Sequence, residues 1–303
     1  MGKIAFVGLG AMGGPMASNI ARKGIALTVY DIAEARVALA VGAGATAAAS
    51  LADAVSGAEI VVTMLPATQH VLQVVTGPGG VLEHIAPGGL LIDMSTIAAH
   101  GTDRLIEACA EKEIGFIDAP VGRLVMHAVE GKSMFMVGCD NEADFQRAKP
   151  LFDAMGTTII RCGKPGSGIR VKLVNNFQVL SIAEITAEAL VLAARLGVDI
   201  GVVKEVNAQT TATNGQMQVN FANKSLMGDT EPGFTVDLSH KDMSLALEAA
   251  AQHRLGLPVG AAVHAVYGAA RSGKYAGRDF SALLDYNADL AGITPPRLPG
   301  AAS

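Results

Sequence analysis

The sequence predicts an α/β protein, in which a Rossmann-type, doubly wound and mostly parallel sheet is followed by an all-helical C-terminal domain. Three features of the 303 residues predict this fold. Short apolar runs alternate with helical patterns through the first half, which is typical of a parallel sheet. A glycine-rich turn at residues 8–13 directly follows the first apolar run. From Gly168 onward the pattern is helical. We therefore predict two domains joined by a long helix, residues 1–164 and residues 165–303.

The strands of the first half are expected where the apolar runs lie. Residues 3–7 form the first strand, a helix runs from Met12 to Lys23, and residues 27–30 form the second strand, which ends on Asp31. Further strands are expected at residues 59–64, 89–93, 115–118, 133–137 and 157–161. Ligands of such sheets bind beyond the carboxyl ends of the strands. The residues at those ends are candidate cofactor contacts, although each by itself is equally consistent with loop and cap chemistry: Leu65, Pro66, Ser95 and Thr96.

The turn at residues 8–13 has the spacing of a dinucleotide-binding motif. Gly8 permits the tight turn, Gly10 lets the backbone approach a pyrophosphate, and Gly13 allows close packing of helix on strand. The pyrophosphate would bind at the N-terminus of the following helix, where N–H groups and the helix dipole favour anions. Asp31 can accept hydrogen bonds from a ribose 2′-hydroxyl and would repel a 2′-phosphate. No arginine follows it directly, since Arg36 is further off, and we therefore expect NAD(H) rather than NADP(H).

The helix that opens the second half, from Gly168 to about Leu196, carries a polar stripe in an otherwise apolar sequence. Lys172, Asn175, Asn176 and Val179 share one face of it, at helical spacing. Burying an ammonium and two amides is costly unless each has a partner. The stripe is therefore either a structural seam between packed helices or the lining of a pocket. Further helices are expected at residues 200–209, 236–246, 246–255, 260–272 and 281–291.

The loop after the predicted strand at residues 115–118 carries Arg123. Its planar guanidinium can bind a carboxylate, a sulfonate or a phosphate through two parallel hydrogen bonds. An arginine on a loop is otherwise a solvated surface residue. Because the loop lies at the expected cofactor edge of the sheet, we interpret Arg123 as a candidate anion-binding residue.

The composition argues against several classes of partner. A net charge of −5 and scattered basic residues give no patch for nucleic acid or for an anionic membrane surface. Residues 4–7 are too short for the apolar region of a signal peptide. The three cysteines are far apart, which suits a reducing cytosol, and the seven histidines show no metal-ligand spacing. We expect a cytoplasmic protein that uses no metal and binds neither nucleic acid nor a membrane.

Several of these motifs together resemble the β-hydroxyacid dehydrogenases, the family that includes 3-hydroxyisobutyrate dehydrogenase and tartronate semialdehyde reductase. The resemblance covers nearly the whole chain and implies a Rossmann domain, a helical domain and a homodimer or homotetramer. It rests on residues 8–13 with 16–19, 63–66 and 93–96, on residues 166–168 with Lys172, Asn175 and Asn176, and on Lys241 with Asp242.

The resemblance also implies roles for individual residues. Lys172 matches the catalytic lysine, which donates a proton to the carbonyl oxygen as the hydride arrives, and Asn176 matches the asparagine that orients the reacting group. The positions implied beside the substrate are Ser95 and Gly122, with Asn175 reaching its acid group. The implied cofactor contacts are Ala11, Met12, Asp31, Leu65, Thr96 and Lys241.

One departure from the family pattern bears on the substrate. Most members read Ser-Gly-Gly where this chain has Gly122, Arg123 and Leu124, and the arginine resembles the sulfolactaldehyde reductase branch, where it binds the sulfonate. Against that branch, Val179 stands where a small hydroxyl donor is expected. We predict NADH-dependent reduction of 3-sulfolactaldehyde to 2,3-dihydroxypropane-1-sulfonate. The alternatives are a dehydrogenase of a carboxylate substrate, of the succinate semialdehyde or 3-hydroxyisobutyrate type, and a non-catalytic NAD-binding sensor.

Overall fold

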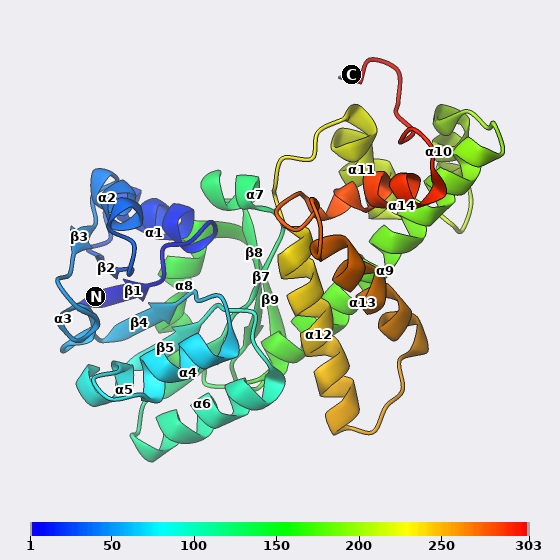
Figure 1. The fold of residues 1–303 in the computed structure, drawn as a ribbon. Coiled ribbons are helices and arrows are strands. Elements are labelled where there is room, and N and C mark those ends of the chain that lie inside the picture. Colours follow the sequence, from blue (N-terminus) through cyan, green and yellow to red (C-terminus); the bar gives the residue numbers. More distant parts are fainter. Residues whose placement is uncertain (1, 302–303) are drawn as a thin grey trace. The chain divides into compact units, whose positions relative to one another are not determined.

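The computed structural model describes residues 2–301 and divides the chain into two compact units, one up to Lys172 and one from Leu173 onward (Figure 1). Residues 1, 302 and 303, which the predicted domain ranges include, lie outside the described residues. The predicted junction stands at residues 164 and 165, whereas the units divide inside helix α9, Ser167–Arg195. The long helix therefore begins in the first unit and continues into the second.

The first unit is built on a mostly parallel sheet, as predicted. Its strand order is β3-β2-β1-β4-β5-β6-β8-β7, with β9 paired to β8. The pairs from β3 to β6 are parallel, and β8 runs antiparallel to β6 and β7. Two short strands were not predicted, because β3 is exposed and β7 lies within the expected loop. The strands are β1 (Ile4–Val7), β2 (Thr28–Tyr30), β3 (Thr46–Ala47), β4 (Ile60–Thr63), β5 (Leu90–Asp93), β6 (Gly115–Asp118), β7 (Val121–Gly122), β8 (Ser133–Gly138) and β9 (Gly156–Gly163).

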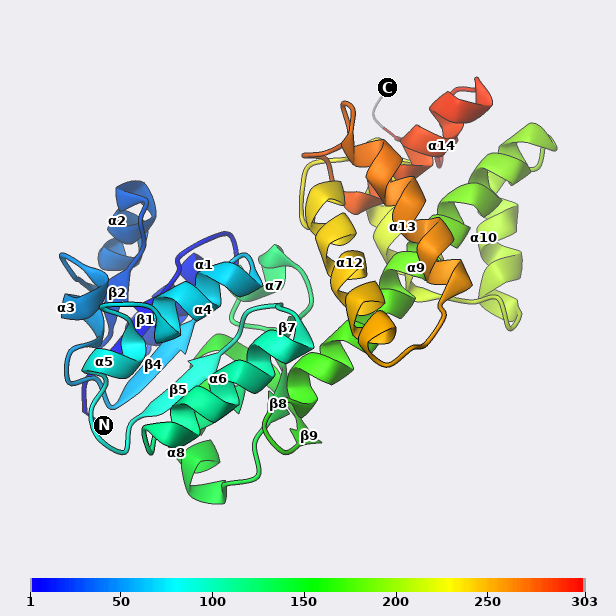
Figure 2. The same cartoon turned by 60° about the horizontal axis from the view of Figure 1, so that its bottom comes forward.

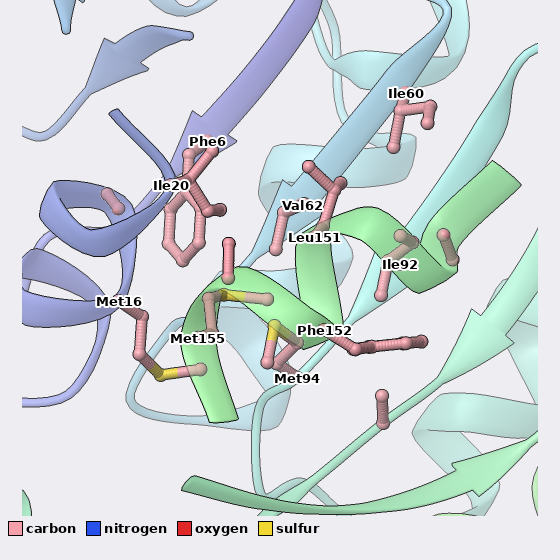
Figure 3. Close-up of a cluster of buried hydrophobic side chains, with 14 of the residues drawn as sticks. Phe6, Met16, Ile20, Ile60, Val62, Ile92, Met94, Leu151, Phe152 and Met155 are labelled. Atoms are coloured by element: carbon pink, nitrogen blue, oxygen red, sulfur yellow. The ribbon is translucent and has the colours of Figure 1, made fainter. Parts of the chain in front are cut away.

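Helices cover both faces of this sheet (Figure 1, Figure 2), so the central strands β1, β4 and β5 are buried at every position. Phe6 of β1 belongs to the core on one face, together with α1 and α8. Its neighbour Val7 belongs to the core on the other face, together with α3 to α6. Figure 3 shows Phe6, Val62 and Ile92 pointing toward residues of α1 and α8. The helices are α1 (Gly13–Arg22), α2 (Glu34–Gly42), α3 (Leu51–Val55), α4 (Thr68–Thr76), α5 (Val81–His84), α6 (Ala99–Glu111), α7 (Val125–Val129) and α8 (Glu142–Met155).

The strand register brings the ends of the parallel strands to one edge. Val7 pairs with Thr63, Thr63 with Asp93, and Asp93 with Asp118. Because the strands run parallel, the segments that follow them emerge side by side at this edge. The expected cofactor and substrate segments of the first unit therefore share one edge of the sheet.

The second unit is helical, as predicted, with a core that includes Leu180 of α9 and Tyr267. The predicted break at Ala246 is wrong, because one helix runs from Val236 to Gln252 without a glycine or a proline to interrupt it. The short helical turns at residues 216–227 were not predicted. The helices are α10 (Ile200–Gln209), α11 (Phe221–Asn223), α12 (Val236–Gln252), α13 (Pro258–Arg271) and α14 (Leu283–Ala291), with a π-helix at Gln216–Asn220 and 3₁₀ turns at Ser225–Met227 and Phe280–Ala282.

Helix α9 is long and apolar enough to cross a membrane by length and composition alone, with a mean hydropathy of 1.6 in its most apolar window. Half of that window is buried inside the structure. Core helices of globular proteins have the same length and composition. The buried positions Leu180, Ala183, Ala187 and Leu190 belong to the core of the second unit.

Candidate active site

The glycine-rich turn is packed so tightly that side chains are excluded from two of its positions. Gly8 has φ +96°, and a Cβ there would lie 2.4 Å from the carbonyl oxygen of Met64. A Cβ on Gly13 would lie 2.1 Å from the carbonyl oxygen of Gly8. On Gly10, by contrast, the nearest atom to an added Cβ is Arg36 Nη1, at 3.8 Å. The backbone at Gly10 is thus open to a close approach, and α1 begins beside it without a side-chain cap at Met12. This arrangement fits a dinucleotide pyrophosphate.

Asp31 is held rigidly against this turn. Its Oδ2 accepts a hydrogen bond from Leu9 N–H at 2.6 Å, and its Oδ1 accepts one from Ala33 N–H at 2.8 Å. The first turn of α2 also brings Arg36 back toward it, so that Nη1 lies 4.0 Å from Asp31 Oδ2. From its place along the chain, Arg36 was expected to lie too far from Asp31. A helix predicted to start at Glu34 could have placed Arg36 near Asp31, because the first helical turn brings the two residues together.

A pocket of about 490 Å³ opens beside this turn. The predicted contacts Gly10 and Ala11 line it, together with two arginines, Arg22 and Arg36. The predicted contacts Met12 and Gly13 are not among the residues that line it. The lining residues are Leu9, Gly10, Ala11, Gly14, Pro15, Ser18, Arg22, Arg36, Leu39 and Val129.

Ser95 is buried and forms hydrogen bonds that link the segment after β4 to the end of β5. Its Oγ accepts a hydrogen bond from Leu65 N–H at 2.9 Å, while Asp93 Oδ1 accepts bonds from Thr63 Oγ1 at 2.8 Å and from Ser95 N–H at 3.2 Å. Burial raises the pKa of Asp93 to about 6, against the opposing effect of these bonds. The predicted contact Leu65 is therefore positioned by Asp93 through Ser95. Pro66 and Thr96 follow these residues at the same edge.

Lys172 lies against the predicted substrate segment. Its Nζ donates a hydrogen bond to the carbonyl oxygen of Val121 at 2.8 Å, next to Gly122. Gly122 is buried in β7, where a Cβ would lie 2.4 Å from Met134 Cε. The structure thus brings Lys172 and Gly122 together within the first unit.

The guanidinium of Arg123, which we expected to bind the substrate anion, is bonded to groups of the protein. Its backbone has φ +73°, which is uncommon for a residue with a side chain. Its Nη1 donates to the carbonyl oxygen of Lys132 at 2.6 Å and to Thr157 Oγ1 at 3.1 Å, and its Nη2 donates to Thr158 Oγ1 at 3.2 Å. Three of the five N–H groups of the guanidinium are therefore bonded to acceptors of the protein itself.

In the second unit, Asn176 is buried and oriented by α12. Its Nδ2 donates to Asp242 Oδ2 at 2.6 Å, and Asp242 Oδ1 lies 3.0 Å from Lys241 Nζ. Asn175 Nδ2 donates to Asn176 Oδ1 at 3.3 Å, and Val179 is half-buried one turn further along. The polar stripe was interpreted as either a structural seam between packed helices or the lining of a pocket. At Asn176 it is a seam, because its side chain bonds to Asp242 of α12. Asp242 belongs to the motif with Lys241 but was not predicted as a site residue.

The chain is similar to known dehydrogenases along nearly its whole length. Residues 3–163 match the model of the NAD-binding domain of 6-phosphogluconate dehydrogenase, and residues 166–287 match that of the NAD-binding domain of NADP-dependent 3-hydroxyisobutyrate dehydrogenase. The chain is 41% identical to 3-sulfolactaldehyde reductase of Escherichia coli (strain K12) over 294 residues, covering 97% of this chain and 98% of that protein. It is 39% identical to NAD-dependent L-serine dehydrogenase of Pseudomonas aeruginosa, covering 93% of this chain and 96% of that protein.

Among solved structures, 3-hydroxyisobutyrate dehydrogenase of Mycobacterium tuberculosis with L-serine superposes with a TM-score of 0.87 at 32% identity. The match covers 95% of this chain and 99% of that one. The sequence motifs, the sheet topology and these full-length matches agree, and the cofactor is NAD(H). The chain therefore belongs to the β-hydroxyacid dehydrogenase family of NAD-dependent oxidoreductases.

Proposed function

We propose that this protein reduces a small acidic aldehyde reversibly, with Lys172 as the general acid. NADH supplies the hydride when it is bound. The observation that carries the proposal is the 2.8 Å hydrogen bond from Lys172 Nζ to Val121, which holds an ammonium at the segment expected to border the substrate. An ammonium has three donor protons, and a bond to a fixed carbonyl restricts where the flexible side chain points.

In reduction, Lys172 donates a proton to the carbonyl oxygen of the aldehyde, and in oxidation it accepts that proton from the alcohol. Asn176 orients the reacting group, and its own amide is oriented by Asp242 at 2.6 Å. Asn175 reaches the acid group of the substrate. Lys172 and Asn176 lie one turn apart on the same helix, α9, which spaces the two polar groups along one face.

We infer that the preferred substrate is 3-sulfolactaldehyde, which is reduced to 2,3-dihydroxypropane-1-sulfonate. The similarity to an enzyme of that name and the presence of Arg123 support this substrate. In binding, the guanidinium exchanges Thr157 and Thr158 for the sulfonate oxygens. A carboxylate substrate is the alternative, favoured by the similarity to L-serine dehydrogenase and by Val179 in place of a hydroxyl donor.

Replacing Lys172 by Ala tests the mechanism. We expect turnover to fall by about 10²–10⁴-fold, the usual contribution of general acid catalysis. NADH binding, followed by fluorescence titration, should be nearly unchanged. Near-normal turnover in this variant would show that Lys172 is not the acid. NADH binding without turnover of any acidic aldehyde in the wild type would favour the non-catalytic sensor.

Kinetics on sulfonate and carboxylate aldehydes test the substrate. Arg123→Ser should weaken the binding of the sulfonate aldehyde, seen as a higher KM, more than it weakens the binding of succinate semialdehyde. The matched control is Arg161→Ser, because Arg161, on β9, also donates to protein acceptors, Glu142 and Cys139. If Arg123→Ser left the KM of every substrate unchanged, the sulfonate assignment would be wrong.

We also propose that the protein is a cytoplasmic homodimer or homotetramer. Large apolar side chains lie exposed along one face of α9 at helical spacing, Val174 (64%), Ile185 (56%) and Leu192 (60%), and exposed Leu196 (69%) directly follows the helix. Such a stripe on one helix is the kind of surface that a second subunit covers. Ile185→Glu with Leu192→Glu should lower the mass measured by light scattering, and an unchanged mass would exclude this face as the interface.

A further inference from the structure

Asp118, the last residue of β6, is a buried carboxylate that the proposed mechanism does not use. Its Oδ1 accepts a hydrogen bond from Gly166 N–H and its Oδ2 accepts one from Ile169 N–H, both at 2.6 Å. Both donors belong to the start of α9, 48 and 51 residues further along the chain. One side chain at the end of a central strand therefore holds the start of the helix that carries Lys172.

These two bonds replace a missing N-cap. Helix α9 begins at Ser167, so Gly166 stands at the N-cap position, where a side-chain oxygen normally accepts the third N–H of the helix. Gly166 has no such oxygen, and its φ of +86° disfavours any residue that does. In a capping box, one side chain binds the third N–H and another binds the N–H of the cap residue. Asp118 accepts both of these N–H groups with one carboxylate.

The fit around the carboxylate is close on both sides. A Cβ on Gly138 would lie 2.1 Å from Asp118 Oδ1. A Cβ on Gly168 would lie 2.9 Å from Asp118 Oδ2 and 2.1 Å from the carbonyl oxygen of Met136. Glycine at both positions lets the first turn of α9 pack directly on the strand ends. The start of the helix thus has little freedom to shift while the carboxylate is in place.

We propose that Asp118 is a positioning residue that sets where Lys172 presents its ammonium. Ile169 and Lys172 lie three residues apart on α9, a rise of about 4.5 Å. The segment that starts at Asp118 reaches Val121 three residues later, where it accepts the Lys172 hydrogen bond at 2.8 Å. The helix and the substrate segment are therefore joined at two points, the cap and the lysine. Removing the cap frees the helix start and lets Lys172 Nζ move away from Val121.

This inference rests on the proposed role of Lys172, and Asp118→Asn tests it. Asparagine keeps the shape but offers only one oxygen, so one of the two N–H groups loses its acceptor. We expect kcat of the holoenzyme to fall by about 10- to 100-fold, because a displacement near 1 Å at a reacting group costs about 10²-fold. The KM of the aldehyde and the Kd of NADH should change little.

The solvent deuterium isotope effect on kcat separates positioning from a loss of folded protein. If the lysine is displaced, proton transfer limits the rate more strongly and the isotope effect should increase. A merely smaller fraction of active enzyme would lower kcat and leave the isotope effect unchanged. That result, or an unchanged kcat, would overturn the proposal.

Asp103→Asn is the matched control. Asp103 also binds the first turn of α9, through both oxygens to Arg170 Nη2 at 2.9 Å, but this ion pair is exposed. The Asp103→Asn variant should therefore have the same kcat and the same isotope effect as the wild type. Lys172→Ala distinguishes failure of the mechanism from failure of the positioning role. If Lys172→Ala retains turnover, the mechanism fails. If Lys172→Ala loses turnover and Asp118→Asn leaves kcat unchanged, the positioning role alone fails.

The wild-type protein offers a test that needs no variant. Amide hydrogen exchange at Gly166 and Ile169 should be as slow as in the interior of α9, because both N–H groups are bonded to a buried carboxylate. Fast exchange at both positions would show that Asp118 does not cap the helix.

Discussion

Lys172 Nζ donates a 2.8 Å hydrogen bond to the carbonyl oxygen of Val121, which joins the start of α9 to the segment that follows β6. A lysine has a long, flexible side chain, and such a side chain supports catalysis only when its surroundings restrict it. Here the restriction comes from the backbone of β7 and from the cap on α9. The segment after β6 and the start of α9 therefore together fix where the Lys172 ammonium lies.

Arg36 should reduce the preference of the protein for NADH over NADPH. Its Nη1 lies 4.0 Å from Asp31 Oδ2, so its charge offsets part of the repulsion between that carboxylate and a 2′-phosphate. Arg36→Ala should weaken NADPH binding by about 1 kcal/mol, as is usual for an exposed charge pair, and leave NADH binding nearly unchanged. Fluorescence titration with both nucleotides measures the ratio of the two Kd values.

Arg22→Ala is the control for that experiment, because Arg22 lines the same pocket but bonds to Asn19 on its own helix. It should leave the ratio of the two Kd values unchanged. Equal weakening of both nucleotides by Arg36→Ala would contradict the prediction.

Gly8→Ala should destabilise the protein and abolish NADH binding. The φ of +96° strains any residue with a Cβ, and the Cβ would also lie 2.4 Å from the backbone oxygen of Met64. Gly24→Ala separates these effects, since Gly24 has φ +77° but no atom within 4 Å of an added Cβ. We expect Gly24→Ala to cost about 1–2 kcal/mol in urea unfolding from backbone strain alone. A cost at Gly8 no larger than that at Gly24 would mean that the turn can relax.

Asp242→Ala should lower both stability and turnover. It leaves the buried Nδ2 of Asn176 without its 2.6 Å acceptor, a loss of about 1–3 kcal/mol. Asp242→Asn keeps an oxygen that can accept this bond and should retain more of both. Thermal unfolding and kcat of the two variants test the order, and equal turnover in Ala and Asn variants would argue that Asp242 does not orient Asn176.

Glu184→Gln should remove a pH dependence of stability. Burial raises the pKa of Glu184 from 4.5 to about 7, and the charge of Glu188 adds to this, while the hydrogen bond from Asn287 Nδ2 at 3.0 Å opposes it. Because the folded pKa lies above the unfolded one, the folded state holds this proton more tightly. The stabilisation is complete below about pH 4.5 and is lost as the pH rises toward 7.

The glutamine variant has no ionisable group at position 184. Its stability should therefore exceed that of the wild type at pH 8 by at most about 3 kcal/mol, and the difference should be smaller at pH 5. Urea unfolding across this range measures the difference. Glu205→Gln, an exposed glutamate on α10, should show no such trend. A wild-type stability that rises between pH 5 and pH 8 relative to the glutamine variant would reverse the expected sign.

Most of the fold could be predicted because its signals are local. A buried parallel strand is a short apolar run, and a long helix shows its period over many turns. The run at residues 115–118 and the helix at residues 200–209 were predicted with the bounds that the structure has. Strand β3 lacked such a signal, because it is two residues long and exposed.

The sequence by itself determined the glycine turn, Asp31, the family and the lysine on the long helix, since each is carried by residue types at fixed spacing along the chain. Only the tertiary structure decided that Asp118 caps α9, that Arg36 returns to Asp31, and that the guanidinium of Arg123 is bonded to Lys132, Thr157 and Thr158. The physical reason is that these contacts join groups in separate elements. Their geometry depends on how the strand ends and helix starts pack, and residue spacing along the chain does not encode it.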